Sequence, residues 1–300
     1  MEARSVKRGP KVWLTACIHG DEVGGMVVIQ EIFRRLKKHP LLKGIVYSFP
    51  LMNPIGFENV TRHIGLDKED LNRAFPGNPS GSLAERIAHK IFSAIIETRP
   101  TLVLDLHNDW IKSIPYALID PRLGADHLEI YEQVGKFSKL TGLVVINEEE
   151  TETAFQVSKK TLSGSFMKHK IPAITLELGE AYVVNEKNVQ DGVTSIWNIL
   201  TSLGMTVPVE REMNHVIPKI AREKSLAYTH QPVSSSSGII RFLVKPGQII
   251  KKGQKFAKIH NVFGKLQETL VSGDDGIVLG YSDSSVAMPG IPVAAFGMFR

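Results

Sequence analysis

Short apolar runs alternate along residues 11–204 with longer stretches in which apolar residues recur every three or four positions. The short runs predict buried strands, and the longer stretches predict amphipathic helices. This alternation indicates an α/β fold, with a mostly parallel sheet covered by helices on both faces. The expected strands are 11–18, 44–51, 101–107, 116–119, 143–147 and 173–178, and the expected helices are 24–38, 82–97, 126–140 and 189–203.

The pattern changes after about residue 208. A loop-like stretch rich in serine and proline spans 231–238, and short strand-like pieces separated by Pro-Gly and Gly-Asp turns follow it. These pieces predict a small all-β domain of about 75 residues. The sequence therefore divides into residues 1–208 and residues 209–300, the second part being a linker and a C-terminal β domain. The expected strands of that domain are 239–244, 256–260, 268–271, 276–281 and 291–296.

The composition excludes several classes of protein. The 300 residues carry 36 Lys and Arg against 31 Asp and Glu, a net charge of +5, and the basic residues are dispersed. Nucleic-acid binding calls for clustered basic residues, so we expect no nucleic-acid partner. The single cysteine, Cys17, excludes an internal disulfide and is expected in the core. No run approaches the roughly 20 apolar residues that span a bilayer, and no secretory signal is recognisable, so we expect a cytoplasmic protein without membrane association.

Two histidines and a glutamate follow or end predicted strands. His19 and Glu22 come directly after the first apolar run, and His107 ends the third. Two imidazoles and one carboxylate are the ligand set of a catalytic zinc site with one position open for water. The His-x-x-Glu pair is a weak signal by itself, and His107 makes it a candidate site for one Zn²⁺ per chain. Asp105 lies on the same strand face as His107, where it would orient the imidazole or form a local contact.

Glu177 interrupts the otherwise apolar strand expected at 173–178. An unpaired buried carboxylate is costly, so this residue should be paired, bound to a metal or functional. Beside a zinc-bound water it would act as the general base. Glu180 is the alternative base, although its place beyond Gly179 favours an exposed loop residue. Because ligand sites gather at the carboxyl ends of parallel strands, Glu177 is expected to lie near the candidate ligands.

The polar stretch from residue 53 to residue 77 predicts a long ordered loop. Within it, Asn72 and Arg73 are suited to bind a carboxylate, because a guanidinium donates two parallel hydrogen bonds and the amide adds another donor. Arg62 is suited to polarise a carbonyl and to stabilise an oxyanion. Surface salt bridges are the alternative for both arginines.

Taken together, these motifs resemble the succinylglutamate desuccinylase/aspartoacylase family, a branch of the zinc carboxypeptidase-like hydrolases. The resemblance implies zinc on His19, Glu22 and His107, and Glu177 as the base. It further implies that Arg62 polarises the acyl carbonyl, that Asn72 and Arg73 hold a substrate carboxylate, and that a mixed, mostly parallel sheet precedes a β domain. The matching segments are 19–22, 53–54, 62, 70–77, 105–107 and 177–179.

The C-terminal part has a resemblance of its own. Residues 244–254 and 275–278 are similar to a biotinyl/lipoyl-type barrel. A carrier domain would present its modified lysine within a short hairpin motif, whereas the corresponding residues 261–265 are longer and lack that context. A packing or gating domain beside the site is therefore favoured over a carrier.

The resulting hypothesis is a zinc-dependent hydrolase that cleaves the amide bond of a small acidic N-acyl amino acid. Residues 1–208 would form its zinc-dependent catalytic domain. One alternative is a metallocarboxypeptidase acting on short peptides, and another is a non-catalytic protein that binds an acidic metabolite. The sequence leaves open the acyl group and the amino acid of the substrate. It also leaves open the oligomeric state, and a homo-oligomer is one of the alternatives.

Overall fold

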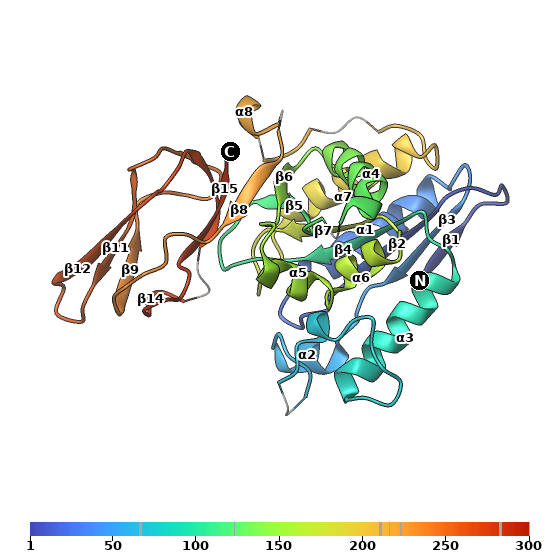
Figure 1. Cartoon of the computed structure of the whole chain (residues 1–300). Coiled ribbons are helices and arrows are strands. Elements are labelled where there is room, and N and C mark those ends of the chain that lie inside the picture. The colour runs from blue at the N-terminus through green and yellow to red at the C-terminus, as the bar shows by residue number, and fades with distance from the viewer. Residues whose placement is uncertain are drawn as a thin grey trace.

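A single large sheet connects the α/β part of the chain to its C-terminal part (Figure 1). The computed structural model describes residues 1–65, 68–122, 124–209, 212–215, 217–222, 224–281 and 284–299. Within these residues the large sheet has eleven strands in the order β1-β3-β2-β4-β7-β5-β6-β8-β15-β13-β10. Their bounds in that order are Glu2–Arg4, Ile45–Phe49, Lys11–Ala16, Leu102–His107, Ala173–Leu178, Pro115–Ile119, Val144–Asn147, Leu226–Thr229, Ala294–Met298, Gly276–Tyr281 and Ile249–Ile250.

The part of the sheet between β3 and β8 is mixed and mostly parallel, as predicted. Strand β2 is parallel to β3 and to β4, β4 is parallel to β7, and β6 is parallel to β5 and to β8. Strand β5 is antiparallel to β7. Because β2, β4 and β7 run in the same direction side by side, their carboxyl ends meet at one edge, where the candidate site residues lie.

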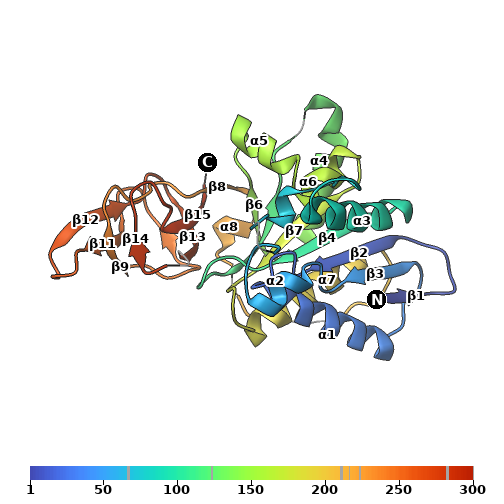
Figure 2. The same ribbon diagram turned by 90° about the horizontal axis from the view of Figure 1, so that it is seen from below.

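Helices cover both faces of this sheet (Figure 2). Helix α1 (Gly24–Lys38) packs beside α7 (Glu186–Ser202) on the face formed by the apolar side chains of β2 and β4. On the opposite face, α3 (Leu83–Glu97) and α6 (Leu162–Lys168) pack together through stacked rings of Phe92 and Phe166. The remaining helical segments are α4 (Leu128–Leu140), α2 (Pro54–Asn59), α5 (Glu152–Ser158), α8 (Lys219–Arg222), η1 (Leu71–Arg73) and η2 (Ala125–His127).

Local sequence signals explain several element boundaries. A capping box begins α3, because the Ser82 side chain accepts from Glu85 N and the Glu85 side chain accepts from Ser82 N. Helix α7 begins at Glu186, earlier than the predicted residue 189, because Asn185 caps it by accepting from Lys187 N. The last strand begins at Ala294 rather than at 291, since Pro292 has no N–H to donate to a ladder.

The predicted long loop contains short helices that the sequence reading missed. Helix α2 begins with Pro54, where Asn53 caps it by accepting from Gly56 N. The 3₁₀ turn η1 contains Asn72 and Arg73 and is capped by Asp70. Both pieces are too short to produce a helical periodicity in the sequence.

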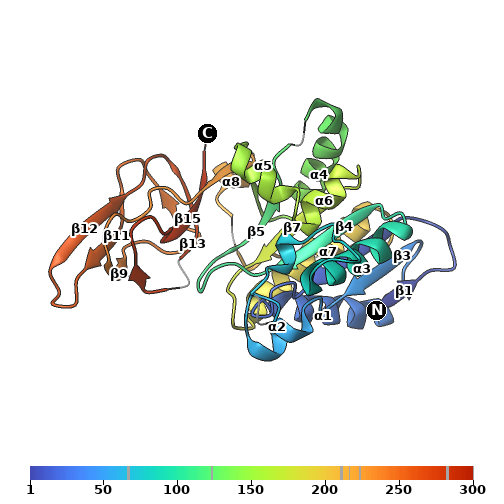
Figure 3. The ribbon, with the colours of Figure 1, turned by 60° about the horizontal axis from the view of Figure 1, so that its bottom comes forward.

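The C-terminal residues form a second sheet that faces the antiparallel end of the large one (Figure 3). Its four described strands follow the order β12-β11-β9-β14, with bounds Leu266–Val271, Lys255–His260, Gly238–Phe242 and Val286–Ala287. Phe256 of β11 and Phe296 of β15 lie edge to face in the shared core. Strand β8 therefore continues the large sheet beyond the predicted boundary at residue 208. An apolar cluster that includes Tyr116 and Leu226 joins residues from both sides of that boundary.

Cys17 is fully buried, as predicted, and burial raises the pKa of its thiol to about 12, so the thiol stays protonated. Each helix in the described ranges is too short or too polar to cross a bilayer.

Candidate metal centre and substrate pocket

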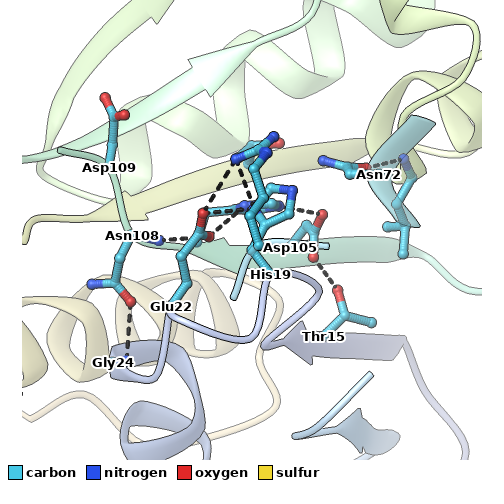
Figure 4. Close-up of polar contacts among 12 residues, drawn as sticks. Thr15, His19, Glu22, Gly24, Asn72, Asp105, Asn108 and Asp109 are labelled. Atoms are coloured by element: carbon cyan, nitrogen blue, oxygen red, sulfur yellow. Dashed lines mark hydrogen bonds and ion pairs between the residues drawn. The ribbon is translucent and has the colours of Figure 1, made fainter. Parts of the chain in front are cut away.

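Three side chains converge at the carboxyl ends of β2 and β4: His19, Glu22 and His107 (Figure 4). The Glu22 carboxylate lies between the two rings, with Oε1 2.6 Å from His19 Nδ1 and Oε2 2.8 Å from His107 Nδ1. One ligand atom from each residue lies within 4.8 Å of the others, and all three side chains are buried. The convergence follows from the sheet, because β2 and β4 are parallel and in register from Val12↔Leu102 to Ala16↔Leu106.

A carboxylate lies behind each imidazole. Asp105 Oδ2 is 2.9 Å from His107 Nε2, and Asp105 Oδ1 accepts a hydrogen bond from Thr15 Oγ1 at 2.7 Å. Asp70 Oδ1 is 3.2 Å from His19 Nε2. Such carboxylates fix the tautomer and the orientation of metal-binding histidines, with Nδ1 directed to the centre in both rings. The sequence predicted the contact of Asp105 and missed that of Asp70.

The charge balance of this cluster favours a bound cation. Burial alone would raise the pKa of Glu22, but the two imidazoles outweigh it and hold that pKa well below its usual range. Burial lowers the pKa of His107, whereas the carboxylates of Asp105 and Glu22 raise it well above its ordinary value. Two nitrogens and one carboxylate oxygen, oriented by hydrogen bonds, are a donor set that suits Zn²⁺. The residues present therefore fit the implied metal.

Backbone contacts hold Glu22 in place at the start of α1. Glu22 Oε2 accepts from Asn108 N at 3.1 Å, and Asn108 Oδ1 accepts from Gly24 N at 3.0 Å (Figure 4). The Asn108 amide also donates to the carbonyls of Gly179 and Glu180. Asn108 thus connects the ends of β4 and β7 to the turn that carries Glu22.

Glu177 lies beside His107, with which it pairs in register across β4 and β7. Its Oε2 is buried and has no hydrogen-bond partner among the described residues. Burial raises the pKa of Glu177 well above its ordinary value, and the carboxylates of Asp109 and Glu22 add to this effect while His107 opposes it. A carboxyl group with a raised pKa and an oxygen without a hydrogen-bond partner among the described residues is suited to accept and return a proton.

Glu180 differs from its sequence expectation. The residue is half-buried rather than exposed, and its Oε2 accepts hydrogen bonds from the amides of Asn185 and Asn188. These contacts tie the loop after β7 to the start of α7, which gives Glu180 a structural role.

The two candidate arginines lie at different places around the cluster. Arg62 Nη2 is 2.9 Å from Asp70 Oδ2, and its Nη1 is 3.7 Å from Glu22 Oε1. Arg73 Nη1 donates to the carbonyl of Asn72 at 2.8 Å. Asn72 is anchored through Oδ1, which accepts from Leu162 N at 2.9 Å. All three predicted polar residues line the same pocket as the metal-ligand candidates.

That pocket has a volume of about 530 Å³ and takes part of its wall from the segment that follows β8. Tyr228 and His230 line it, with Tyr228 OH 2.9 Å from His230 Nε2. The sequence reading missed both residues because their place beside the site depends on β8 joining the sheet next to β6. A separate apolar depression of about 760 Å³ beside α3 includes Leu51 and Leu83 but none of the site residues.

The catalytic domain of the succinylglutamate desuccinylase/aspartoacylase family matches residues 8–203, more than half of the chain. The chain belongs to this family. Members of the succinylglutamate desuccinylase/aspartoacylase family are hydrolases of N-acyl amino acids, and the matched range contains all seven predicted site residues.

A curated relative is similar to this chain in sequence, and solved structures are similar to it in fold. The N-alpha-acetyl-L-2,4-diaminobutyric acid deacetylase of Halomonas elongata is 25% identical over 267 residues, covering 86% of this chain and 73% of that protein. The product-bound ectoine utilization protein EutE (DoeB) from Ruegeria pomeroyi has a TM-score of 0.79 at 19% identity, covering 99% of this chain and 87% of that one. A metallo-carboxypeptidase from Burkholderia cenocepacia has a TM-score of 0.53 at 16% identity, covering 68% and 60%. The predicted carboxypeptidase-like α/β fold with an added C-terminal β-sheet is thereby confirmed.

Proposed function

We propose that the protein is a zinc-dependent hydrolase that cleaves the amide bond of a small acidic N-acyl amino acid. One observation carries the proposal. The His-Glu-His donor set lies in the same pocket as Glu177, whose Oε2 has no hydrogen-bond partner among the described residues. Arg62 and Arg73 also line this pocket. We further propose that residues 1–208 form the catalytic domain, that residues 209–300 complete the pocket wall, and that the protein acts in the cytoplasm.

His19, Glu22 and His107 would hold one Zn²⁺ per chain. When bound, the metal would polarise the amide carbonyl and lower the pKa of a coordinated water. The contribution of the chain is orientation, since Asp70 and Asp105 hold the two imidazoles by their outer nitrogens.

Glu177 would take a proton from the attacking water and deliver it to the leaving nitrogen. The raised pKa of its carboxyl group supports this role, because burial makes the carboxylate a stronger base than an exposed glutamate. Its position in register with His107 supports it further, since the reacting atoms must lie within reach of both groups.

Arg62 would donate to the carbonyl oxygen as negative charge develops there. Its Nη1 lies 3.7 Å from Glu22 Oε1, so the guanidinium reaches the rim of the metal-ligand cluster. A cation held by Asp70 in a partly buried site stabilises an oxyanion more strongly than it would in water. Asn72 and Arg73 would hold the carboxylate of the substrate.

The test is a turnover screen of N-acyl amino acids and of dipeptides with zinc-loaded protein. We expect about one zinc per chain and hydrolysis of N-acyl amino acids. Glu177→Gln should retain the metal and lose on the order of 100-fold or more in kcat. Glu150→Gln, at an exposed position outside the pocket, is the matched control.

Three results would contradict the proposal. Full activity in metal-free protein would exclude the zinc, and near-normal kcat in Glu177→Gln would assign the base elsewhere. A preference for dipeptides over N-acyl amino acids would identify a carboxypeptidase instead.

A further inference from the structure

An open apolar groove beside α3 contains none of the residues that the proposed mechanism uses. This α3 groove lies between residues 49–54, at and after the end of β3, and residues 83–91 of α3. Its volume is about 760 Å³, within the range of roughly 300–1,000 Å³ that is typical of small-molecule sites. The groove is therefore large enough for a ligand of its own.

The sequence of α3 supplies one apolar wall of this groove. Leu83, Ile87 and Ile91 recur every four positions, so they form a continuous stripe along the helix. The stripe extends the apolar arc of α3 beyond the face that packs on the sheet, and Leu83 remains 38% exposed. Leu51 and Pro54 form part of the other wall. An aliphatic ligand between the two walls would remove apolar surface from water on both sides.

Three basic side chains, Arg86, His89 and Lys90, also line the α3 groove. Arg86 and Lys90 lie four positions apart, one helical turn from each other, beside the apolar stripe. Among the described residues, no acidic side chain lines the groove, and no carboxylate oxygen lies within 4.0 Å of a nitrogen of Arg86 or Lys90. Glu85, the adjacent acid on α3, accepts from Ser82 N in the capping box. The positive charges of the groove are therefore available to an anion.

The combination of apolar walls and basic side chains restricts the chemistry of a ligand. A neutral apolar molecule would cover the stripe and leave the two cations without a counter-charge. A small inorganic anion would pair with the cations and leave the apolar walls in contact with water. A molecule that joins one carboxylate to an aliphatic chain meets both requirements, because its charge pairs with the cations while its chain covers the walls.

The size of the groove favours a small molecule over a protein. Eleven residues line it, whereas a stable protein interface uses roughly 20–30 residues on each side. A protein partner would therefore need contacts well beyond the groove, while a free aliphatic carboxylate fits within it.

We propose that the α3 groove binds a small carboxylate with an aliphatic chain. The chain packs against Leu51, Leu83 and Ile87, and the carboxylate accepts hydrogen bonds from Arg86 and Lys90. This site is separate from the candidate metal centre, because none of its lining residues lines the pocket there. The inference is therefore independent of the proposed amide hydrolysis.

The experiment measures the binding of octanoate to the wild-type protein by titration calorimetry, in parallel with octan-1-ol and butyrate. Octanoate should bind about three- to tenfold more tightly than octan-1-ol, which has the same chain without the charge, because two exposed ion pairs contribute about this much. It should bind about tenfold or more tightly than butyrate, which has the same charge, because the longer chain buries more methylene groups.

Variants of the two sides of the groove locate the ligand. The double variant Arg86→Gln/Lys90→Gln should weaken octanoate binding by about three- to tenfold and leave octan-1-ol binding unchanged. Leu83→Ser, at a solvent-exposed position, should weaken the binding of both. Lys136→Gln is the matched control, because it removes an exposed cation of α4 outside the groove and should bind both molecules like wild-type protein. Circular dichroism checks that the variants fold.

Equal affinity of wild-type protein for octanoate and octan-1-ol would overturn the proposal, since the cations would then contribute nothing. Octanoate binding that is unchanged in the double variant and lost in Arg73→Ala would place the carboxylate in the metal-centre pocket instead. Binding of an acidic amphipathic peptide but not of octanoate would identify a protein partner and would equally contradict a small-molecule site. None of these measurements depends on turnover, so their outcome is separate from that of the proposed function.

Discussion

Asp70 Oδ1 lies 3.2 Å from His19 Nε2, on the side of the ring opposite to Glu22. The pair joins the turn after β2 to a 3₁₀ turn 51 positions later in the chain. It gives His19 the same support that Asp105 gives His107, although only Asp105 and His107 lie close together in the sequence. The candidate metal centre therefore has one carboxylate behind each imidazole.

Removing either carboxylate should weaken zinc binding. Asp70→Asn and Asp105→Asn are each expected to reduce zinc affinity by about 10- to 100-fold, because the imidazoles lose their orientation and part of their basicity. Competition with a chelating dye measures the affinity, and circular dichroism checks that the variants fold. Asp126→Asn, at an exposed position, serves as the control. Unchanged affinity in both variants would exclude this orienting role.

Arg62→Ala should reduce kcat far more than it changes KM. The expected loss is on the order of 100-fold, since a donor to a developing oxyanion acts in the transition state. Arg62→Lys should recover part of the activity, because it restores the charge without the two-pronged contact to Asp70. Steady-state kinetics on the best N-acyl amino acid provide the test, and a change confined to KM would assign Arg62 to ground-state binding instead.

The pH dependence of stability should reveal the cost of ionising Glu148 in the folded state. Its pKa is raised from an ordinary 4.5 to about 7, so the folded state disfavours the ionised form. Below pH 4.5 the group is neutral in both states and carries no penalty, and the penalty grows as pH rises to about 7 and then stays constant. The groups that act on it are Asp120, Arg73 and Glu149.

Glu148→Gln should therefore have nearly the same Tm as wild-type protein at pH 4.5, where the penalty is only beginning, and a clearly higher Tm at pH 8. Thermal unfolding at the two pH values, without substrate, measures the difference. A Tm difference that is the same at both pH values would show that ionisation of Glu148 is not its cause.

Ser82→Ala should destabilise the fold without affecting the site. The expected cost is about 1 kcal/mol of unfolding free energy, because the capping box at the start of α3 loses its acceptor for Glu85 N. Denaturant unfolding measures the change, and turnover should remain normal. Ser80→Ala, which removes a nearby exposed hydroxyl, should change the stability by less than half as much.

Elements with a strong local signal were predictable from the sequence. The helix at 24–38 and the strand at 173–178 have their predicted bounds, since periodicity and apolar runs are set by neighbouring residues. The short helices near Asn53 and Asp70 were not predictable in this way, because their stability comes from single caps and from packing.

The sequence by itself determined the α/β alternation, the family resemblance and the placement of His19, His107 and Glu177 at strand ends. Only the tertiary structure decided which distant groups meet: Asp70 with His19, and Asp120 with Glu148 through the register of β5 and β6. It also brought Tyr228 and His230 into the pocket wall through β8. The physical reason is that strand periodicity is local, whereas strand order and register depend on packing of the whole core.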